Sequence, residues 1–156
     1  MRRKDREITD RETINEIIRS CDCCRLGFRD RQGVYILPLN FGFTEENGQR
    51  VFFFHGAAQG KKAELIKSQP HIGFELDTAH EVESAPDACG YSFRYKSVIG
   101  EGSVCFINND GEKRAALCLI MEHYTGKADW QFDERILAST AVIKLTVTSL
   151  SCKERK

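Results

Sequence analysis

The chain has 156 residues, a length that suits one domain with a substantial buried core. Its 23 basic and 23 acidic residues balance, which argues against a broad electrostatic attraction to nucleic acid or to an anionic membrane. No apolar run approaches the roughly 18 residues of a membrane-spanning helix, and no hydrophobic stretch follows the charged N-terminal segment 1–7. We therefore expect a cytoplasmic protein that binds neither nucleic acid nor membrane.

Seven cysteines are many for this length, and their spacing is irregular. Because the chain shows no secretion signal, we expect free thiols in a reducing compartment. The cluster of Cys21, Cys23 and Cys24 has two interpretations: small, partly buried residues at a helix–strand junction, or a redox or zinc site. No second Cys or His pair stands at zinc-site spacing. This favours the first interpretation, and we predict no metal site.

The predicted elements begin with a helix near residue 10. Thr9-Asp10-Arg11-Glu12 has the form of a capping box, in which the Thr9 hydroxyl caps the helix, and apolar residues then recur at helical spacing. A half-buried strand over 24–29 and a turn over 30–33 lead into residues 34–41, which are apolar on both faces. We expect the core to cover one of these faces and a ligand or partner the other. Pro38 places this strand at a sheet edge or makes it irregular.

The second half of the chain continues this succession of strands and turns. The pair Asn47-Gly48 is a strong hairpin signal before a strand over 51–55. We then predict a helix over 61–68, a strand over 71–77, a loop over 78–90, and one bent or two separate strands over 91–107. A helix over 110–124, a last strand over 141–147 and a charged tail over 151–156, frayed at its end, complete the prediction.

These elements predict a protein that is mainly β with some α. About six strands do not alternate regularly with helices, so a parallel doubly wound sheet is not expected. Antiparallel strands with about three flanking helices favour a small barrel instead, in a single domain over residues 1–150.

The segment Phe54-His55-Gly56-Ala57-Ala58-Gln59-Gly60-Lys61-Lys62 has the features of a phosphate site. An apolar strand ends at His55, and the small residues after it allow a ligand to approach the backbone closely. Lys61 and Lys62 then open a helix, whose free backbone N–H groups and dipole favour an anion. The alternative is a strand-to-helix turn with solvated lysines.

Two other segments are candidates for ligand contacts. The strand over 35–41 contains Pro38, so exposed carbonyls and amides there can hydrogen-bond the polar rim of a planar ring. Lys96 and Ser97 are neighbours on another strand, and their side chains project to opposite faces. Only one of these two residues can therefore point into a given pocket.

Taken together and in this order, the motifs resemble those of the nitroimidazole resistance proteins, which belong to the pyridoxamine 5′-phosphate oxidase-like superfamily. The resemblance runs over about residues 1–150 and is carried by Arg25-Leu26-Gly27, Tyr35, Pro38-Leu39-Asn40-Phe41-Gly42, Phe54-His55-Gly56-Ala57, Gly60-Lys61-Lys62, Pro70, Phe74-Glu75 and Tyr95-Lys96-Ser97-Val98-Ile99-Gly100. It implies a split β-barrel that forms a homodimer and binds FMN, or alternatively FAD, in a cleft between the subunits.

The resemblance also implies roles for individual residues. Lys62 matches the lysine that contacts the flavin phosphate, and Lys61 is the next candidate. His55 matches a histidine beside the active site and is our candidate catalytic residue. The other implied cofactor contacts are Leu37, Pro38, Leu39, Asn40, Phe54, His55, Gly56, Ala57, Lys96 and Ser97.

The predicted function follows from these assignments. It is a flavin-dependent oxidoreductase acting on a small molecule, with nitroimidazole or nitroaromatic reduction as the activity that the resemblance implies. The alternative is a flavin- or haem-binding protein without turnover, in which His55 would be a haem ligand. The cysteine cluster and the loop over 78–90 do not follow from the family pattern.

Overall fold

The computed structural model describes residues 3–156, and Met1 and Arg2, which begin the predicted domain, lie outside this range. A 3₁₀ turn, η1 (Lys4–Arg6), and strand β1 (Glu7–Ile8) come first, followed by helix α1 (Arg11–Ser20). The remaining elements, in chain order, are β2 (Cys24–Asp30), β3 (Gly33–Leu39), β4 (Gly42–Glu46), β5 (Gln49–Ala57), α2 (Lys61–Ser68), β6 (His71–Glu83), β7 (Ser92–Ile107), α3 (Asp110–Thr125), α4 (Glu134–Ser139) and β8 (Thr140–Arg155).

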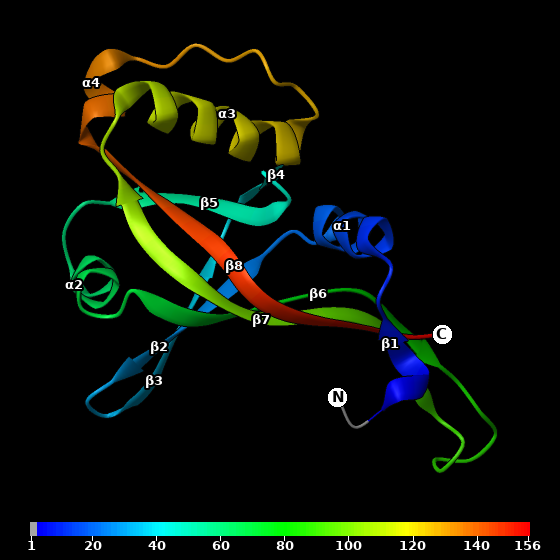
Figure 1. Ribbon diagram of the computed structural model, residues 1–156. Coiled ribbons are helices and arrows are strands. Elements are labelled where there is room, and N and C mark those ends of the chain that lie inside the picture. The colour runs from blue at the N-terminus through cyan, green and yellow to red at the C-terminus, as the bar shows by residue number, and fades with distance from the viewer. Residues whose placement is uncertain (1–2) are drawn as a thin grey trace.

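Eight strands form one antiparallel sheet in the order β3-β2-β6-β7-β8-β5-β4, with β1 paired to the far end of β8. The sheet curls but does not close, because β3 and β4 each have one strand neighbour (Figure 1). This is the predicted split barrel, and β3 is the edge strand that Pro38 indicated. Helices α3 and α4 lie above β5, whereas α2 lies beside the opposite face of the sheet (Figure 1). In residues 3–156 no helix is long and apolar enough to cross a membrane.

The core fills the inside of the curled sheet and is rich in phenylalanine. The ring centroid of Phe52 lies within 6.4 Å of those of Phe41, Phe43, Phe54 and Phe74. Helix α1 adds the apolar stripe that its sequence predicted. These contacts hold strands from distant parts of the chain together, since aromatic side chains bury the largest areas of apolar surface.

Strand β5 is buried on both faces over its central residues 51–54. Phe52 and Phe54 face the barrel core, whereas Phe53 packs against α3 on the other face. Helix α3 comes close because Gly42 of β4 has no side chain; a Cβ atom there would lie 2.7 Å from a backbone nitrogen of α3. The buried part of β5 ends before His55, whose side chain is exposed.

Two predicted turns are confirmed by their backbone conformation. Asn47 and Gly48, between β4 and β5, have φ angles of 50° and 78°. Two successive positive φ angles are typical of the tight hairpin turn that this pair favours. Helix α3 ends at Gly126, whose φ of 69° gives the left-handed cap expected of glycine.

The helices differ from the prediction in two respects. The cap of α1 is Asp10 and not Thr9: the Asp10 carboxylate accepts a hydrogen bond from the Thr13 amide at 2.9 Å. In addition, α4 was not predicted, and it brings the α-helices to four. It has six residues, of which Leu137 alone is buried, so it shows no helical stripe.

The predicted loop over 78–90 is wrong for its first half, because β6 continues to Glu83 beside β7. A bulge between Thr78 and Glu81 interrupts the side-chain alternation, and Ala79 adopts a positive φ of 55° there. The distal parts of β6 and β7 form an arm that projects from the sheet (Figure 1).

The predicted frayed tail is also wrong. Strand β8 continues to Arg155, so the predicted boundary at residue 150 falls inside a strand. Its last residues pair with β7 on one side, and Cys152 and Lys153 also pair with β1 on the other. Backbone hydrogen bonds, rather than an apolar pattern, therefore hold this charged segment in place.

Candidate cofactor site

The predicted phosphate turn joins the end of β5 to the start of α2 and holds Lys62 against the backbone of Gly56. A Cβ atom at position 56 would overlap the Lys62 ammonium, so the contact requires glycine. Lys62 is half-buried, and burial lowers the pKa of its ammonium. Within residues 3–156 no carboxylate pairs with Lys62. A partly buried cation without a counter-ion is a candidate anion site.

The first turn of α2 adds backbone donors beside Lys62. Gly60 is the N-cap, with a φ of 96° that favours glycine, and no side chain caps the helix. The N–H groups of the first turn are therefore left for solvent or an anion. The turn thus combines both predicted features of a phosphate site.

Lys61, the other candidate lysine, is engaged with the β2–β3 hairpin. Its ammonium pairs with the Asp30 carboxylate at 2.5 Å and lies 4.6 Å from the centroid of the Tyr35 ring. The hydrogen bond to Asp30 raises the pKa of Lys61. Because these contacts must break before Lys61 can bind a phosphate, Lys62 is the better candidate.

The strand predicted to follow the flavin ring lies at an open edge of the sheet. In β3, Leu37 and Leu39 are half-buried, whereas Pro38 is exposed, as is Asn40 just after the strand. The pairing of β4 with β5 ends at Gly42 and Phe53. Residues 54–57 of β5 therefore pair with β8 alone. Unpaired backbone groups are thus present on both β3 and the end of β5, as a planar polar ring would require.

His55 and Lys62 lie on opposite faces of β5. Gly56, which Lys62 covers, lies on the same face of β5 as Phe54, whereas His55 lies on the same face as Phe53. The His55 imidazole is exposed at the end of the strand. Within one chain, the His55 imidazole can contact a group bound at Lys62 only if that group extends past the unpaired edge of β5.

Lys96 and Ser97 lie far from the phosphate turn. Gly56 pairs with Ala141 near the start of β8, whereas Ser97 pairs with Lys153 near its end. The difference, 153 − 141, is 12 residues, or roughly 40 Å of strand. Lys96 pairs with Glu154 at 3.4 Å, and Ser97 is buried. The structure therefore does not bring this pair to Lys62 within one subunit.

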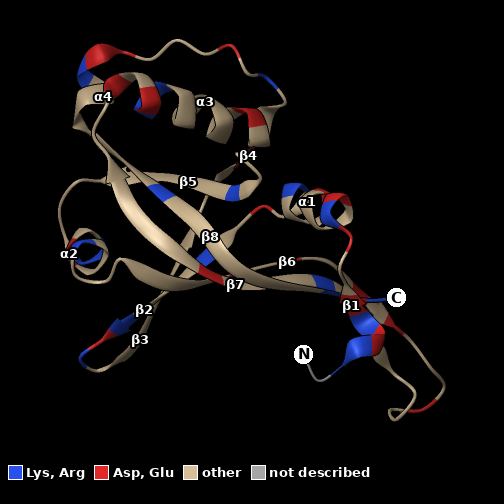
Figure 2. Ribbon diagram, viewed as in Figure 1, with Lys and Arg blue, Asp and Glu red and all other residues tan. Residues whose placement is uncertain are grey.

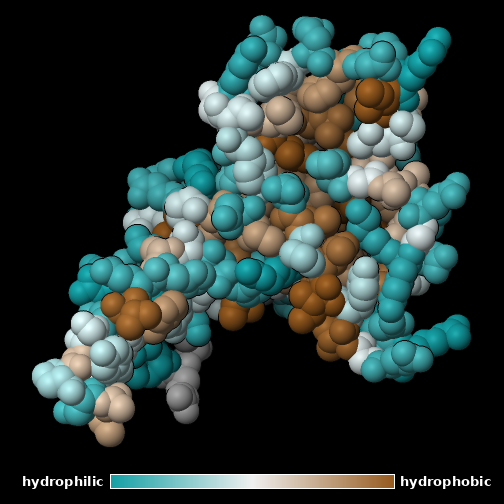
Figure 3. All heavy atoms as spheres, turned by 180° about the vertical axis from the view of Figure 1, so that it is seen from behind, coloured by the Kyte–Doolittle hydropathy of each residue, from teal (hydrophilic) through white to brown (hydrophobic). Residues whose placement is uncertain are grey.

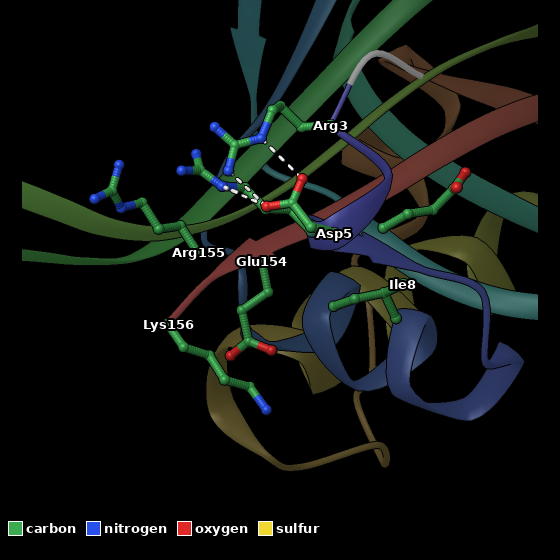
Figure 4. A pocket seen from close by; sticks show the side chains of 8 residues that line it. Arg3, Asp5, Ile8, Glu154, Arg155 and Lys156 are labelled. Carbon is green, nitrogen blue, oxygen red and sulfur yellow. Dashed lines mark hydrogen bonds and ion pairs between the residues drawn. The ribbon is translucent and has the colours of Figure 1, made fainter.

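A cavity of about 480 Å³ lies near the two ends of the chain, between η1, β1 and the end of β8 (Figure 4). Its lining is charged, and part of this charge is already paired, as in the ion pair of Arg3 with Asp5 at 2.5 Å. None of the predicted site residues lines it. We therefore do not assign the cofactor to this cavity.

The cysteines are free thiols, and those of the N-terminal cluster are largely buried. Burial raises the pKa of Cys21 to about 12 and that of Cys152 to about 11, and it holds the pKa of Cys24 well above its usual value. In the part of the chain that the structure describes, no group of three or more His, Cys, Asp or Glu side chains is placed to hold a metal ion. The burial of Cys21 and Cys24, on either side of the half-buried Cys23, favours the junction interpretation of the cluster.

Thiol labelling can test this interpretation. At about pH 8, iodoacetamide should label the exposed Cys89 and Cys105 and leave Cys21 and Cys152 unmodified, because the thiolate is the reactive form. Mass spectrometry of the peptides measures the result, with protein in urea as the fully labelled control. Equally fast labelling of Cys21 and Cys89 in the folded protein would contradict the prediction.

The sequence profile of the pyridoxamine 5′-phosphate oxidase family matches residues 10–154, from the cap of α1 to the end of β8. The chain belongs to this family. Membership accounts for the barrel and for the order of the motifs around the phosphate turn. No curated protein matches the chain at a significant level.

Many solved structures are similar to the chain, and three of them are described here. A protein provisionally named for 5-nitroimidazole antibiotic resistance in Bacteroides thetaiotaomicron is 29% identical, with a TM-score of 0.81 over 95% of this chain and 86% of that one. The flavocytochrome Anf3 from Azotobacter vinelandii is 19% identical, with a TM-score of 0.80 over 100% and 72%. An FAD- and haem-binding protein from Mycobacterium smegmatis is 18% identical, with a TM-score of 0.80 over 97% and 74%. The last two share the fold.

Proposed function

We propose that this protein is a flavin-dependent oxidoreductase that holds the phosphate of its cofactor at the turn between β5 and α2. The observation that carries the proposal is the half-buried Lys62 ammonium, which lies against Gly56 with no carboxylate partner in residues 3–156. FMN is the smallest flavin with such a phosphate, and FAD carries the same group. Family membership and a relative named for FAD binding support a flavin.

A bound flavin would supply the transfer of hydride or electrons, while the chain binds and orients it. Lys62 neutralises the phosphate together with the N–H groups at the start of α2. The backbone of residues 37–40 hydrogen-bonds the rim of the ring. His55, exposed at the end of β5, is the proposed proton donor to a small nitroaromatic substrate. The relative named for 5-nitroimidazole resistance supports this substrate class.

We also propose a homodimer formed through the outer face of the sheet, which is the face that carries Ile36. Residues that pair across strands lie on the same face of the sheet. The pairs Gly27–Ile36 and Gly27–Gly73 put Ile36 on the face of Gly73, which is also the face of Glu75 and of its partner Ile99. Both side chains are exposed, to 61% and 49%. Apolar surface gathers over the β2–β3 hairpin and on the arm (Figure 3).

The outer face is also hollowed, as an interface between copies requires. A trough of about 300 Å³, mostly apolar, runs over Gly27 and Gly73 beside Val34 and Ile36. Exposed apolar side chains beside a hollow favour a protein interface, and here the ion pairs of Arg25 with Glu75 and Asp77 lie on the same face. Ser97 shares the face of Ile99 but is buried, whereas the Lys96 side chain projects to the opposite face.

Visible spectroscopy of the purified protein tests the proposed function. We expect flavin absorption bands, or uptake of added FMN or FAD, with mass analysis of the released cofactor. Absence of both would reject the proposal. A Soret band would instead favour the haem-binding alternative. Reduction of the bound flavin by NAD(P)H and its reoxidation by a nitroaromatic compound would distinguish an enzyme from a protein that only holds the cofactor.

Replacement of Gly56 by alanine should weaken flavin binding about fivefold. The new methyl group would occupy the position of the Lys62 ammonium, and the flexible lysine would have to move aside. Isothermal titration calorimetry with FMN measures the change. Ala128→Ser, at an exposed position between α3 and α4 and outside the predicted site, is the control. Unchanged affinity in Gly56→Ala would show that the position of Lys62 against the strand is unimportant.

A further inference from the structure

A cavity of about 460 Å³ opens where strand β8 lacks a neighbour on one side. On this side β8 pairs with β5 as far as the pair Thr146 and Val51, and it pairs with β1 from Cys152 onward (Figure 1). Residues 147–151 lie between these two stretches and line the cavity. The cavity therefore occupies a gap in the sheet, with β1 at one end and the start of β5 at the other. Its volume is typical of sites for small organic ligands.

The edge of β8 in this gap offers backbone hydrogen-bonding groups. In the described part of the chain no strand covers this side of residues 147–151. An edge of this kind presents unpaired N–H and C=O groups, and an amide group of a ligand can pair with them as a strand would. Ile14 and Leu150 line the same cavity, so an aliphatic group beside that amide would contact apolar surface.

A largely buried arginine lines the β5 end of the cavity. The Arg50 side chain is 12% exposed. Its Nε donates a hydrogen bond to the side-chain oxygen of the buried Asn15 at 2.7 Å, and its Nη2 donates one to the Arg11 carbonyl at 3.1 Å. Within residues 3–156 its Nη1 donates none. A guanidinium has more N–H donors than these two bonds use, so others remain for a ligand.

The charge of Arg50 is only partly balanced. The Glu45 carboxylate lies 3.9 Å from Arg50 Nε but 2.5 Å from Arg11 Nη2, so it pairs mainly with Arg11. Two guanidinium groups and one carboxylate leave a net positive charge at the start of β5, where Figure 2 shows basic residues on both β5 and α1. A guanidinium that is largely removed from water and has free donors suits a carboxylate, which matches it in shape and charge.

The acidic residue of the lining, Glu7, lies away from Arg50. Glu7 pairs with Lys153 of β8, whereas the residue after Arg50 pairs with Thr146; the difference, 153 − 146, is 7 residues, or roughly 24 Å of strand. The cavity is thus positive at its β5 end only. The phosphate turn follows the opposite end of β5, so the cavity is separate from the proposed cofactor site.

We propose that this cavity binds an acylated amino acid, either as a small molecule or as the C-terminal residue of a peptide. The carboxylate pairs with Arg50, the adjacent amide hydrogen-bonds the free edge of β8, and an aliphatic side chain packs against Ile14 and Leu150. Both β1 and β5 run antiparallel to β8. A ligand that lies in the gap in the direction of these two strands has its carboxylate at the Arg50 end.

Isothermal titration calorimetry of the purified protein tests this proposal. N-acetyl-leucine should bind, and N-acetyl-leucinamide, which lacks the carboxylate, should bind about tenfold more weakly. Arg50→Met should lower the affinity for N-acetyl-leucine by about the same factor. Arg114→Met is the matched control, because Arg114 is also partly buried, at 35% exposed, and pairs with Glu134 of α4, away from the cavity. Added FMN should leave the affinity unchanged.

Thr9→Trp is the second variant, because Arg50→Met leaves the buried Asn15 without its partner and may not fold. Thr9 is exposed and lines the cavity beside β1, so the indole should fill the gap and lower the affinity about tenfold. Circular dichroism shows whether each variant is folded. An acetylated tetrapeptide that ends in leucine distinguishes the two sources of the ligand: tighter binding than that of N-acetyl-leucine indicates a peptide C-terminus, and equal or weaker binding indicates a small molecule.

Four results would overturn the proposal. The first is failure to bind either N-acetyl-leucine or the tetrapeptide, which would leave the proposed function standing. The second is equal affinity for N-acetyl-leucine and its amide. The third is an affinity for N-acetyl-leucine that folded Thr9→Trp retains, or that Arg50→Met and Arg114→Met lose equally. The fourth is displacement of N-acetyl-leucine by FMN, which would mean that both bind at the phosphate turn.

Discussion

Replacement of Lys62 by methionine is expected to weaken flavin binding about 30-fold. A hydrogen bond to a charged group contributes about 2 kcal/mol, and each 1.4 kcal/mol corresponds to a factor of about ten in affinity. Methionine keeps most of the apolar stem of the side chain but lacks the ammonium, so the change removes the charged group that lies against Gly56. Calorimetric titration of the apoprotein with FMN measures the loss.

The matched control is Lys61→Met at the neighbouring position. We expect it to change the affinity less than threefold, because the Lys61 ammonium is held by Asp30 and Tyr35. An equal loss in both variants would mean that the two lysines share the phosphate. If neither variant loses affinity for FMN, the central support for the proposed function is removed.

The pH dependence of binding should also distinguish Lys62. Burial lowers the pKa of this ammonium, so it loses its charge at a lower pH than an exposed lysine does. The affinity for FMN should therefore fall as the pH rises through that lowered pKa. In Lys62→Met the affinity should be lower and should not fall in this way. A wild-type affinity that stays constant up to the pH where ordinary lysines titrate would contradict the assignment.

Replacement of Ile36 by aspartate is expected to convert the proposed dimer into monomers. Ile36 lies on the outer face of the sheet, beside the trough over Gly27 and Gly73. In a two-fold interface the change introduces two carboxylates into the same apolar contact, and burying an unpaired charge costs several kcal/mol. Sedimentation equilibrium at several protein concentrations measures the outcome.

Ile136→Asp provides the control for this experiment. Ile136 of α4 is 66% exposed, much like Ile36 at 61%, but it lies outside the proposed interface. We expect this variant to remain a dimer, and circular dichroism should show both variants folded. A dimer that survives in Ile36→Asp would place the interface elsewhere. A wild-type protein that is monomeric throughout would reject the dimer itself.

The sequence predicted those elements whose side chains alternate regularly between strong turns. The hairpin at Asn47-Gly48 and the helix that ends at Gly126 were correct because glycine is needed there for a positive φ. The β6 half of the arm was missed because the bulge after Thr78 interrupts the side-chain alternation, whereas the β7 half lies within the strand predicted over 91–107. The end of β8 was missed because backbone pairing stabilises it, and local side-chain patterns do not record such pairing.

The candidate site was predictable in part for the same reasons. Gly56 and Lys62 are close in sequence, so a local motif contains both. The contact of Lys61 with Asp30 joins residues that are far apart in the chain, and no local pattern indicates it. Alternation along β5 already separates His55 from Gly56, although the motif groups the two.

The link between Lys61 and the β2–β3 hairpin affects how a cofactor would be selected. The strand proposed for the ring and the turn proposed for the phosphate belong to separate parts of the chain, and the contacts of Lys61 with Asp30 and Tyr35 fasten one to the other. These exposed contacts favour one separation of the strand and the turn before any ligand arrives, which reduces the ordering cost of association. Because these contacts favour one spacing between the strand and the turn, a flavin analogue with a shortened ribityl chain would contact one of them and not the other.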